Sequence, residues 1–151
     1  MENLGCGCPG SMARVIERPE AADTRGAKAV SELRQWPVQL HLVPPTAPYF
    51  QNADILICAD CVAFAMGSSH QDLLKGKALA IACPKLDDTT PYVDKLAQIF
   101  SVNAIKSITV AIMEVPCCRG LDVMVREALA KSGKEITLES IIVGINGDRR
   151  N

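Results

Sequence analysis

Short apolar runs alternate with amphipathic stretches along most of the chain. Runs of strand length occupy residues 38–43, 54–60, 78–83, 107–115 and 136–144. Two of the stretches between them, residues 91–103 and 121–132, repeat their apolar positions with a helical period. A weaker helical pattern covers residues 61–74, where glycine and serines interrupt it, and residues 48–53 are expected to form a short helix or turn.

Strands separated by helices of about a dozen residues are typical of βαβ units, whose strands are parallel. A crossover between parallel strands is almost always right-handed, which places helices on both faces of the sheet. We therefore predict one three-layer α/β domain over residues 36–151, with a mostly parallel, five-stranded sheet. Residues 1–35 are expected to form a cysteine- and glycine-rich flap and a connector.

The composition fits a globular domain of this kind. The 151 residues are 48% hydrophobic and 22% charged, which is enough for one core, and aromatics at 4% make that core aliphatic. A net charge of −1 provides no basic surface for nucleic acid or an anionic membrane. The apolar runs are too short to span a bilayer, and the start of the chain lacks the pattern of a signal peptide. We therefore expect a cytoplasmic protein.

Cysteine is the most informative residue type in this sequence. The chain contains Cys6, Cys8, Cys58, Cys61, Cys83, Cys117 and Cys118. In a chain that is not secreted, an odd number of cysteines is more typical of metal ligands or redox thiols than of disulfides. A free cysteine can also be an ordinary small core residue, but this explanation suits only one or two of the seven.

Most of the cysteines coincide with the carboxyl ends of predicted strands. Five lie at or just after such an end, namely Cys58, Cys61, Cys83, Cys117 and Cys118. The carboxyl ends of parallel strands share one edge of the sheet, where open α/β folds bind their ligands. We therefore predict that these thiols cluster at that edge, with the N-terminal flap folding over them to supply Cys8 or Cys6.

A site made of sulfur ligands suits an iron–sulfur cluster or zinc. Structural zinc sites usually contain two CxxC-like pairs, whereas this chain has one, from Cys58 to Cys61. A four-iron cluster is wider than a single ion and accommodates ligands from distant loops more easily. Glycines near several of the cysteines let backbone amides approach the sulfurs, and hydrogen bonds to sulfur tune a cluster's potential. Prolines beside Cys8, Cys83 and Cys117 stiffen these loops. We therefore expect a [4Fe-4S] cluster, with zinc as the alternative.

The motifs CPGS, ADILICADC, CPKLDD and MEVPCCRGL together resemble a known domain. This domain follows the twin-cluster module in 4Fe-4S ferredoxin-type iron–sulfur proteins of anaerobic bacteria, and the resemblance extends from Cys8 to about Gly147. It implies electron transfer, with a ferredoxin or another redox protein as the partner. The CxxCxxCxxxCP signature of the ferredoxin module itself does not occur in this sequence.

The resemblance also implies a set of site residues. The cysteines that match the family are Cys8, Cys61, Cys83, Cys117 and Cys118. Cys6 and Cys58 are additional cysteines and are less favoured as ligands. His70 occupies a position similar to one in the family.

Two other classes of function stay open at the level of sequence. An enzyme would keep an open position on the cluster or on a zinc ion and use Asp60 or His70 for proton transfer. The ordinary role for Asp60 is to cap the following helix, and for His70 to lie in a polar loop or helix end. A thiol redox protein would instead exchange disulfides through Cys58 and Cys61 or through Cys117 and Cys118, since a thiol at a helix start often has a lowered pKa. No glycine motif for nucleotide binding is present, and a homo-oligomer is compatible with the sequence.

Overall fold

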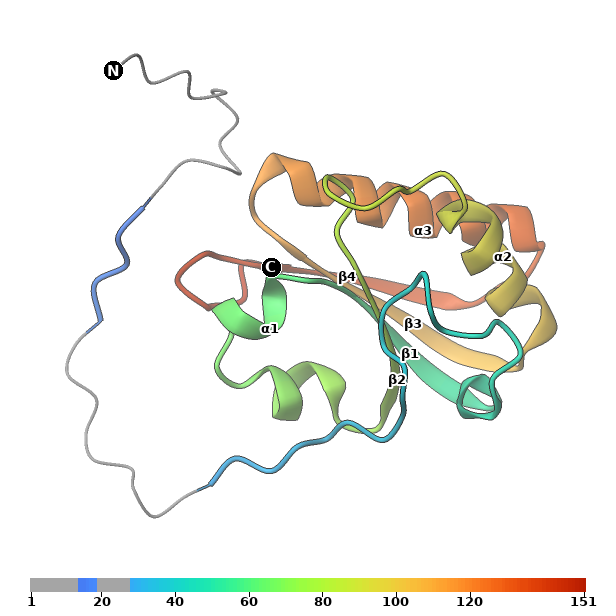
Figure 1. Ribbon diagram of the computed structural model, residues 1–151, viewed down its shortest axis with the longest axis horizontal. Coiled ribbons are helices and arrows are strands. Elements are labelled where there is room, and N and C mark those ends of the chain that lie inside the picture. Colours follow the sequence, from blue (N-terminus) through green and yellow to red (C-terminus); the bar gives the residue numbers. More distant parts are fainter. Residues whose placement is uncertain (1–13, 19–27) are drawn as a thin grey trace.

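Within residues 14–18 and 28–151, which the computed structural model describes, the chain forms one four-stranded sheet (Figure 1). The strands are β1 (Ala53–Ala59), β2 (Lys77–Ala82), β3 (Ile105–Met113) and β4 (Thr137–Val143). They lie in the order β2-β1-β3-β4, and every neighbouring pair is parallel. The predicted α/β fold with a parallel sheet is confirmed, but the described residues contain four strands where five were expected.

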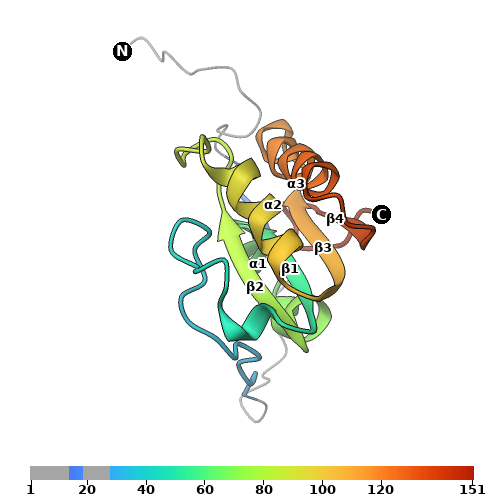
Figure 2. The same ribbon diagram turned by 90° about the vertical axis from the view of Figure 1, so that its right-hand side faces the viewer.

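The helices are divided unequally between the two faces of the sheet. The two long helices, α2 (Tyr92–Val102) and α3 (Arg119–Ser132), pack side by side on one face (Figures 1 and 2). The opposite face carries the short helix α1 (Val62–Ala65) and the π-helix η3 (His70–Leu74). The 3₁₀ turns η2 (Pro48–Phe50) and η4 (Pro116–Cys118) precede β1 and follow β3. No helix in the described part of the chain is both long and apolar enough to cross a membrane.

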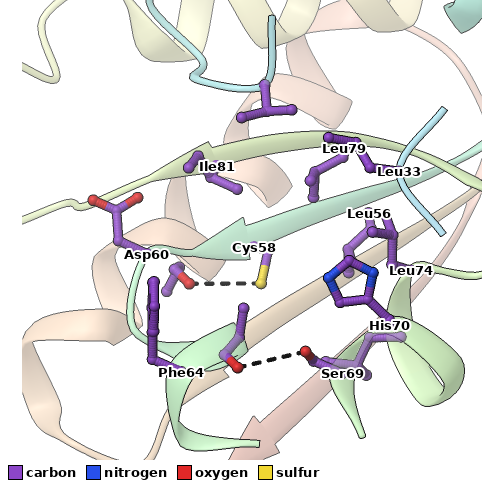
Figure 3. A pocket seen from close by; sticks show the side chains of 14 residues that line it. Leu33, Leu56, Cys58, Asp60, Phe64, Ser69, His70, Leu74, Leu79 and Ile81 are labelled. Carbon is purple, nitrogen blue, oxygen red and sulfur yellow. Dashed lines mark hydrogen bonds between the residues drawn. The ribbon is translucent and has the colours of Figure 1, made fainter. Parts of the chain in front are cut away.

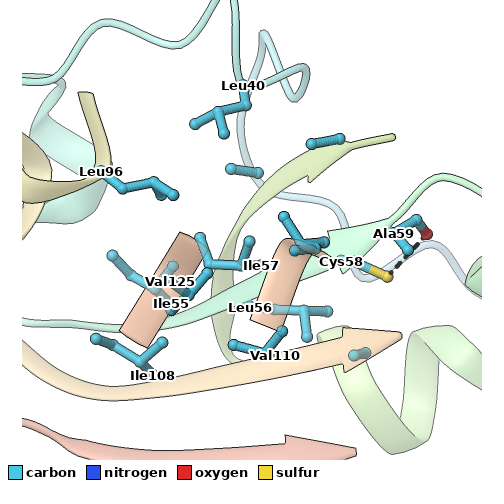
Figure 4. Packing of buried hydrophobic residues seen from close by; sticks show 14 of the residues in the cluster. Leu40, Ile55, Leu56, Ile57, Cys58, Ala59, Leu96, Ile108, Val110 and Val125 are labelled. Carbon is cyan, nitrogen blue, oxygen red and sulfur yellow. Dashed lines mark hydrogen bonds between the residues drawn. The ribbon is translucent and has the colours of Figure 1, made fainter. Parts of the chain in front are cut away.

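The central strand β1 is apolar on both of its faces because both are covered. Ile55 and Ile57 are almost fully buried in the core on the side of α2 and α3 (Figure 4). Leu56 and Cys58 alternate with them and face α1 and η3. A strand covered on both faces consists of a continuous run of apolar residues, which explains why the sequence pattern predicted β1 correctly.

The expected strand at residues 38–43 does not form, and this accounts for the missing fifth strand. Only Gln39 makes an isolated bridge, to Ile81 of β2. The carbonyl of Gln39 then accepts the backbone N–H groups of Leu42 at 2.8 Å and Val43 at 3.0 Å, so the chain turns back on itself. Leu40 and Val43 are buried while Leu42 is 65% exposed. The burial therefore follows the spacing of a turn, and the alternation in the sequence was misleading.

The expected helix at residues 61–74 is interrupted. Helix α1 ends after Ala65, because Met66 adopts an extended backbone conformation. The buried Ser69 precedes the second piece, η3, which Lys75 closes by donating its N–H to the carbonyl of His70 at 2.9 Å. The glycine and serines at residues 67–69 favour such a break, because serine side chains compete for backbone hydrogen bonds.

The outer strands of the sheet are hydrogen-bonded to segments outside the sheet. At β2, the side-chain amide of Gln35 donates to the carbonyl of Leu79 at 2.8 Å and accepts the N–H of Leu79 at 2.7 Å. Ile81 of the same strand pairs with the carbonyl of Val38 and the N–H of Leu40. At β4, the final residues return antiparallel to the strand, where the carbonyl of Ile142 accepts the N–H of Arg150 at 2.8 Å.

Candidate functional site

The strand order β2-β1-β3-β4 places a topological switch point at the carboxyl end of the sheet, between β1 and β3. These neighbouring strands continue into connections on opposite faces, since β1 leads to α1 and η3 while β3 leads to α3. Open α/β sheets bind their ligands at such a switch point, just outside the carboxyl ends of the strands. The loops that flank this switch point are therefore where a functional site is expected.

Both flanking loops carry cysteines. Cys61 follows β1 and occupies the residue before the first turn of α1. Cys117 and Cys118 belong to η4, directly after β3. Cys83 follows β2, on the other side of β1, and continues into Pro84. The loops after β1, β2 and β3 thus each contribute at least one thiol to the same end of the sheet.

The loops that follow β2 and β3 are in contact, although β1 lies between their strands. A Cβ atom placed on Gly120, at the start of α3, would lie 3.3 Å from the Cβ of Pro84. Glycine at this position allows the close approach, because a larger side chain would push the two loops apart. The residues that follow Cys83 and Cys118 are therefore held against one another.

The thiols at this end differ in their exposure to solvent. Cys61 is exposed, and Cys83 and Cys117 are half-buried. Cys118 and Cys58 are buried, with 7% and 5% of their surface exposed. A ligand approaching from solvent would therefore meet Cys61, Cys83 and Cys117 first.

Burial and neighbouring negative charges raise the pKa of two thiols at the carboxyl end of the sheet, Cys61 and Cys118. Burial has the largest effect on the pKa of Cys61, and negative charge on Cys83, Asp60 and Cys117 raises it further. The pKa of Cys118 is raised to about 11, mainly by burial. A hydrogen bond with the backbone of Met113 lowers it, whereas negative charge on Cys117 and Cys61 raises it. Thiols from different loops therefore lie within electrostatic reach of one another. Cys61 and Cys118, whose pKa is raised, stay protonated near neutral pH unless a cation compensates their charge.

Cys58 is a separate case, because its side chain points into the interior. Its sulfhydryl donates to the carbonyl of Ala59 at 3.5 Å. Burial, followed by the charges of Asp60 and Cys118, raises its pKa to about 12. This environment is typical of a structural cysteine rather than of a reactive thiol.

The loop of Cys83 is anchored by a residue that the sequence did not single out as functional. The carboxylate of Asp87 accepts the backbone N–H of Cys83 at 3.0 Å, the side-chain amide of Gln39 at 3.1 Å and the hydroxyl of Tyr92. The backbone N–H of Leu86 also points at the sulfur of Cys83, with a nitrogen-to-sulfur distance of 3.4 Å. The only signal in the sequence was an aspartate four residues after a cysteine, which is equally common in solvated loops.

Asp60 lies at the same end of the sheet but does not cap α1. The helix begins after Cys61, and no side chain caps its first turn, so the expected capping role is wrong. The backbone N–H of Asp60 donates to the carbonyl of Ala82 at 3.1 Å, which ties the loop after β1 to β2. Burial, followed by the negative charge of Asp87, raises the pKa of the Asp60 carboxyl group.

His70 lies in η3 and lines a cavity on the α1 side of the sheet, together with Cys58 (Figure 3). Its Nδ1 atom accepts the backbone N–H of Glu32 at 3.0 Å. The predicted thiols Cys61, Cys83, Cys117 and Cys118 are therefore at the carboxyl end, whereas His70 is in the cavity. Asp60, which directly follows β1, lines the cavity as well. Cys6 and Cys8 lie outside the described residues.

The spacing of the potential ligand side chains in the described residues does not provide a site for a single metal ion. Among residues 14–18 and 28–151, no three Cys, His, Asp or Glu side chains are grouped closely enough to hold one metal ion. The described thiols thus do not form a ready single-ion site.

Comparison with known proteins identifies the class of the domain. Residues 47–150 match the model of a family described as a Rossmann-like domain, and the chain belongs to that family. A protein of Archaeoglobus fulgidus, described as uncharacterized, is 36% identical over 118 residues, which cover 78% of this chain and 83% of the relative. No solved structure matches the chain. Since Rossmann-like folds serve many functions, the function has to be argued from the site itself.

Proposed function

We propose that the protein binds an iron–sulfur cluster of the [4Fe-4S] type at the carboxyl end of its sheet and transfers electrons to a ferredoxin or another redox protein. One observation carries the proposal. Cys61, Cys83 and Cys117 follow three adjacent strands of the sheet, and their loops are all at its carboxyl end, the end at which open α/β sheets bind ligands. The contact between Gly120 and Pro84 supports it, because it holds two of these loops together.

The ligands follow from the exposure of the thiols. Cys61, Cys83 and Cys117 are accessible, and each comes from a different loop. Cys118, which follows Cys117 directly, or Cys8, which lies outside the described residues, would be the fourth ligand. Cys58 is not proposed as a ligand, because its sulfur is buried and hydrogen-bonded on the α1 side of β1.

The chemistry of the loops suits a cluster. Sulfur is the donor that iron–sulfur clusters require, and hydrogen bonds to ligand sulfur are one means by which a protein tunes the potential. The N–H of Leu86 near the sulfur of Cys83 would supply such a bond. Because Cys61 is exposed, a redox partner would approach the cluster closely at this side.

Zinc and thiol exchange are supported less well. Zinc needs several ligands around one ion, and the described residues contain no such group. Thiol exchange needs a thiol with a lowered pKa, whereas the pKa of Cys58, of Cys61 and of Cys118 is raised.

The test is to purify the full chain without oxygen, reconstitute it with iron and sulfide, and measure bound iron, bound sulfide and the visible spectrum. We expect a brown protein with about four irons per chain and a broad absorption typical of clusters with thiolate ligands. Substituting Cys61→Ser, Cys83→Ser or Cys117→Ser should each reduce the iron content. Cys58→Ser is the matched control and should leave it unchanged.

Two results would overturn the proposal. One is a colourless protein without iron and sulfide after anaerobic reconstitution. The other is a cluster whose iron content falls with Cys58→Ser but not with the three substitutions at the carboxyl end. Reduction by dithionite, followed by oxidation on mixing with an oxidised ferredoxin, tests the electron-transfer part separately.

A further inference from the structure

A cavity lies on the α1 side of the sheet, between strands β1 and β2 and the helical pieces α1 and η3 (Figure 3). Its volume is about 190 Å³. A cavity of roughly 150 Å³ lined by apolar side chains is large enough for benzene, whereas sites for drug-sized ligands start at roughly 300 Å³. The cavity therefore has room for a molecule slightly larger than benzene.

The walls of the cavity are mostly apolar. The strands and η3 contribute large aliphatic side chains to the lining, namely Leu56 of β1, Leu79 and Ile81 of β2, and Leu73 and Leu74 of η3. Leu79 and Ile81 are only half-buried, although they lie in a strand of the sheet, because their side chains face this space. The cavity therefore favours an apolar occupant, since apolar surface is more stable out of water.

The imidazole ring of His70 places a polar nitrogen atom in this mostly apolar cavity. The Nδ1 atom of His70 accepts the N–H of Glu32, so the neutral ring carries its proton on Nε2. Figure 3 shows the other ring nitrogen turned toward the cavity and toward Cys58. Among the hydrogen bonds of the described residues, none involves this nitrogen. Nε2 therefore presents a free N–H donor inside an apolar space.

We propose that this cavity binds a small apolar molecule that carries one hydrogen-bond acceptor, such as a ketone or aldehyde oxygen, and that His70 donates to that oxygen. A donor in an apolar site discriminates strongly, because a ligand without an acceptor leaves the donor unpaired. The backbone N–H of Glu32 donates to Nδ1 of His70 and thereby fixes the tautomer and the orientation of the ring, as the hydrogen-bond partner of a histidine commonly does.

The proposal is independent of the iron–sulfur cluster, since the cavity is complete without any residue from the loops after β2 and β3. The cavity nevertheless adjoins the loop that carries Cys61, because the three residues before Cys61 line it, namely Cys58, Ala59 and Asp60. A molecule bound here would therefore lie beside the carboxyl end of β1.

The test compares two probes of similar size, cyclohexanone with an acceptor and methylcyclohexane without one. Binding to the full chain, purified without iron, is followed by chemical shifts of backbone amides in η3 and β2. We expect cyclohexanone to bind about tenfold more tightly than methylcyclohexane, which is the preference that one hydrogen bond confers. His70→Phe should remove this preference and retain the binding of methylcyclohexane.

Two variants test the location. Ile81→Phe and Ala63→Phe each place a ring in the cavity from a different wall, and either should abolish the binding of both probes. Val123→Phe, on the exposed face of α3, is the matched control and should bind as the unmodified chain does. The proposal is wrong if neither probe binds, if both bind equally tightly, or if a folded cavity-filling variant binds them unchanged.

Discussion

The carboxylate of Asp87 accepts a hydrogen bond from the backbone N–H of Cys83 at a distance of 3.0 Å. The same carboxylate accepts from Gln39 and from Tyr92, so a single half-buried group ties the loop after β2 to the segment before β1 and to the start of α2. The position of Cys83 therefore depends on its own loop, on the start of α2 and on Gln39, which lies 48 positions before Asp87 in the sequence.

Removing this carboxylate should destabilise the fold. Asp87→Ala leaves three donors without their acceptor, and we expect the free energy of unfolding to fall by about 2–3 kcal/mol, as for other part-buried networks that lose one partner. Urea unfolding followed by circular dichroism measures the change. Asp88→Ala is the control, because Asp88 is exposed and bonds only to Thr90, and it should shift the midpoint much less.

If the proposed cluster binds at the carboxyl end of the sheet, the close contact between Gly120 and Pro84 predicts that Gly120→Val lowers cluster binding without loss of the fold. Gly120→Val places side-chain atoms where a Cβ already lies 3.3 Å from Pro84, so the loops of Cys83 and Cys118 must separate. The free energy of unfolding should change by less than about 1 kcal/mol, because valine is the better helix former and offsets part of the strain. Iron content after reconstitution should fall.

Gly67→Val provides the control for this experiment, because a Cβ at Gly67 meets nothing within 4 Å. It should bind as much iron as the unmodified chain. Equal iron contents for both variants would show that the contact at Gly120 does not position the ligands.

The environment of Cys58 predicts a loss of stability in alkali. Its pKa is about 12 in the folded chain, against an ordinary value of 9.0. Between these values the unfolded chain releases the thiol proton while the folded chain retains it, so the folded state becomes less stable as the pH rises. The contribution of this residue approaches about 1.4 kcal/mol for each pH unit.

Cys58→Ala tests this dependence, since it removes the titrating group and leaves only a small apolar side chain. The unfolding free energies of both proteins would be compared between pH 8 and pH 11, where we expect the unmodified chain to lose stability more steeply. Parallel curves would mean that Cys58 is solvated when folded.

The side chain of Gln35 should contribute measurably to stability. Gln35→Ala leaves both the N–H and the carbonyl of Leu79 without their partners, and we expect a loss of about 1–2 kcal/mol. Gln98→Ala, an exposed position on α2, is the control and should have little effect. Thermal unfolding of the two variants measures the difference.

The sequence predicted the regular core of the fold well. The four runs that became β1 to β4 were each located to within two residues. The central strands β1 and β3 stand out as continuous apolar runs, because both of their faces are covered over most of their length. Residues 38–43 were misread because alternation of apolar residues over six positions also arises in a turn, once the Gln39 carbonyl accepts two N–H groups. The break at residues 67–69 depended on Met66 leaving the helical conformation, which glycine and serine permit but do not require.

The candidate site was only partly predictable. The sequence could place cysteines at the ends of strands, but not the strand order that makes β1 the neighbour of both β2 and β3. It also could not separate His70 from the thiols, because the partner of His70 is the backbone of Glu32, 38 positions earlier in the chain. The anchoring role of Asp87 depends on Tyr92 and Gln39, and no local pattern connects these residues.

The hydrogen bonds at the two outer strands restrict how the protein associates with others. The outward-facing backbone groups of Leu79 and Ile81 in β2, and of Ile142 in β4, already have partners within the chain. An unprotected outer strand can pair with other molecules and support amyloid-like growth, and this chain protects its own strands at these positions. An added strand would find no free backbone groups at these positions, so the partner proposed above would be recognised through side chains on the helices and loops.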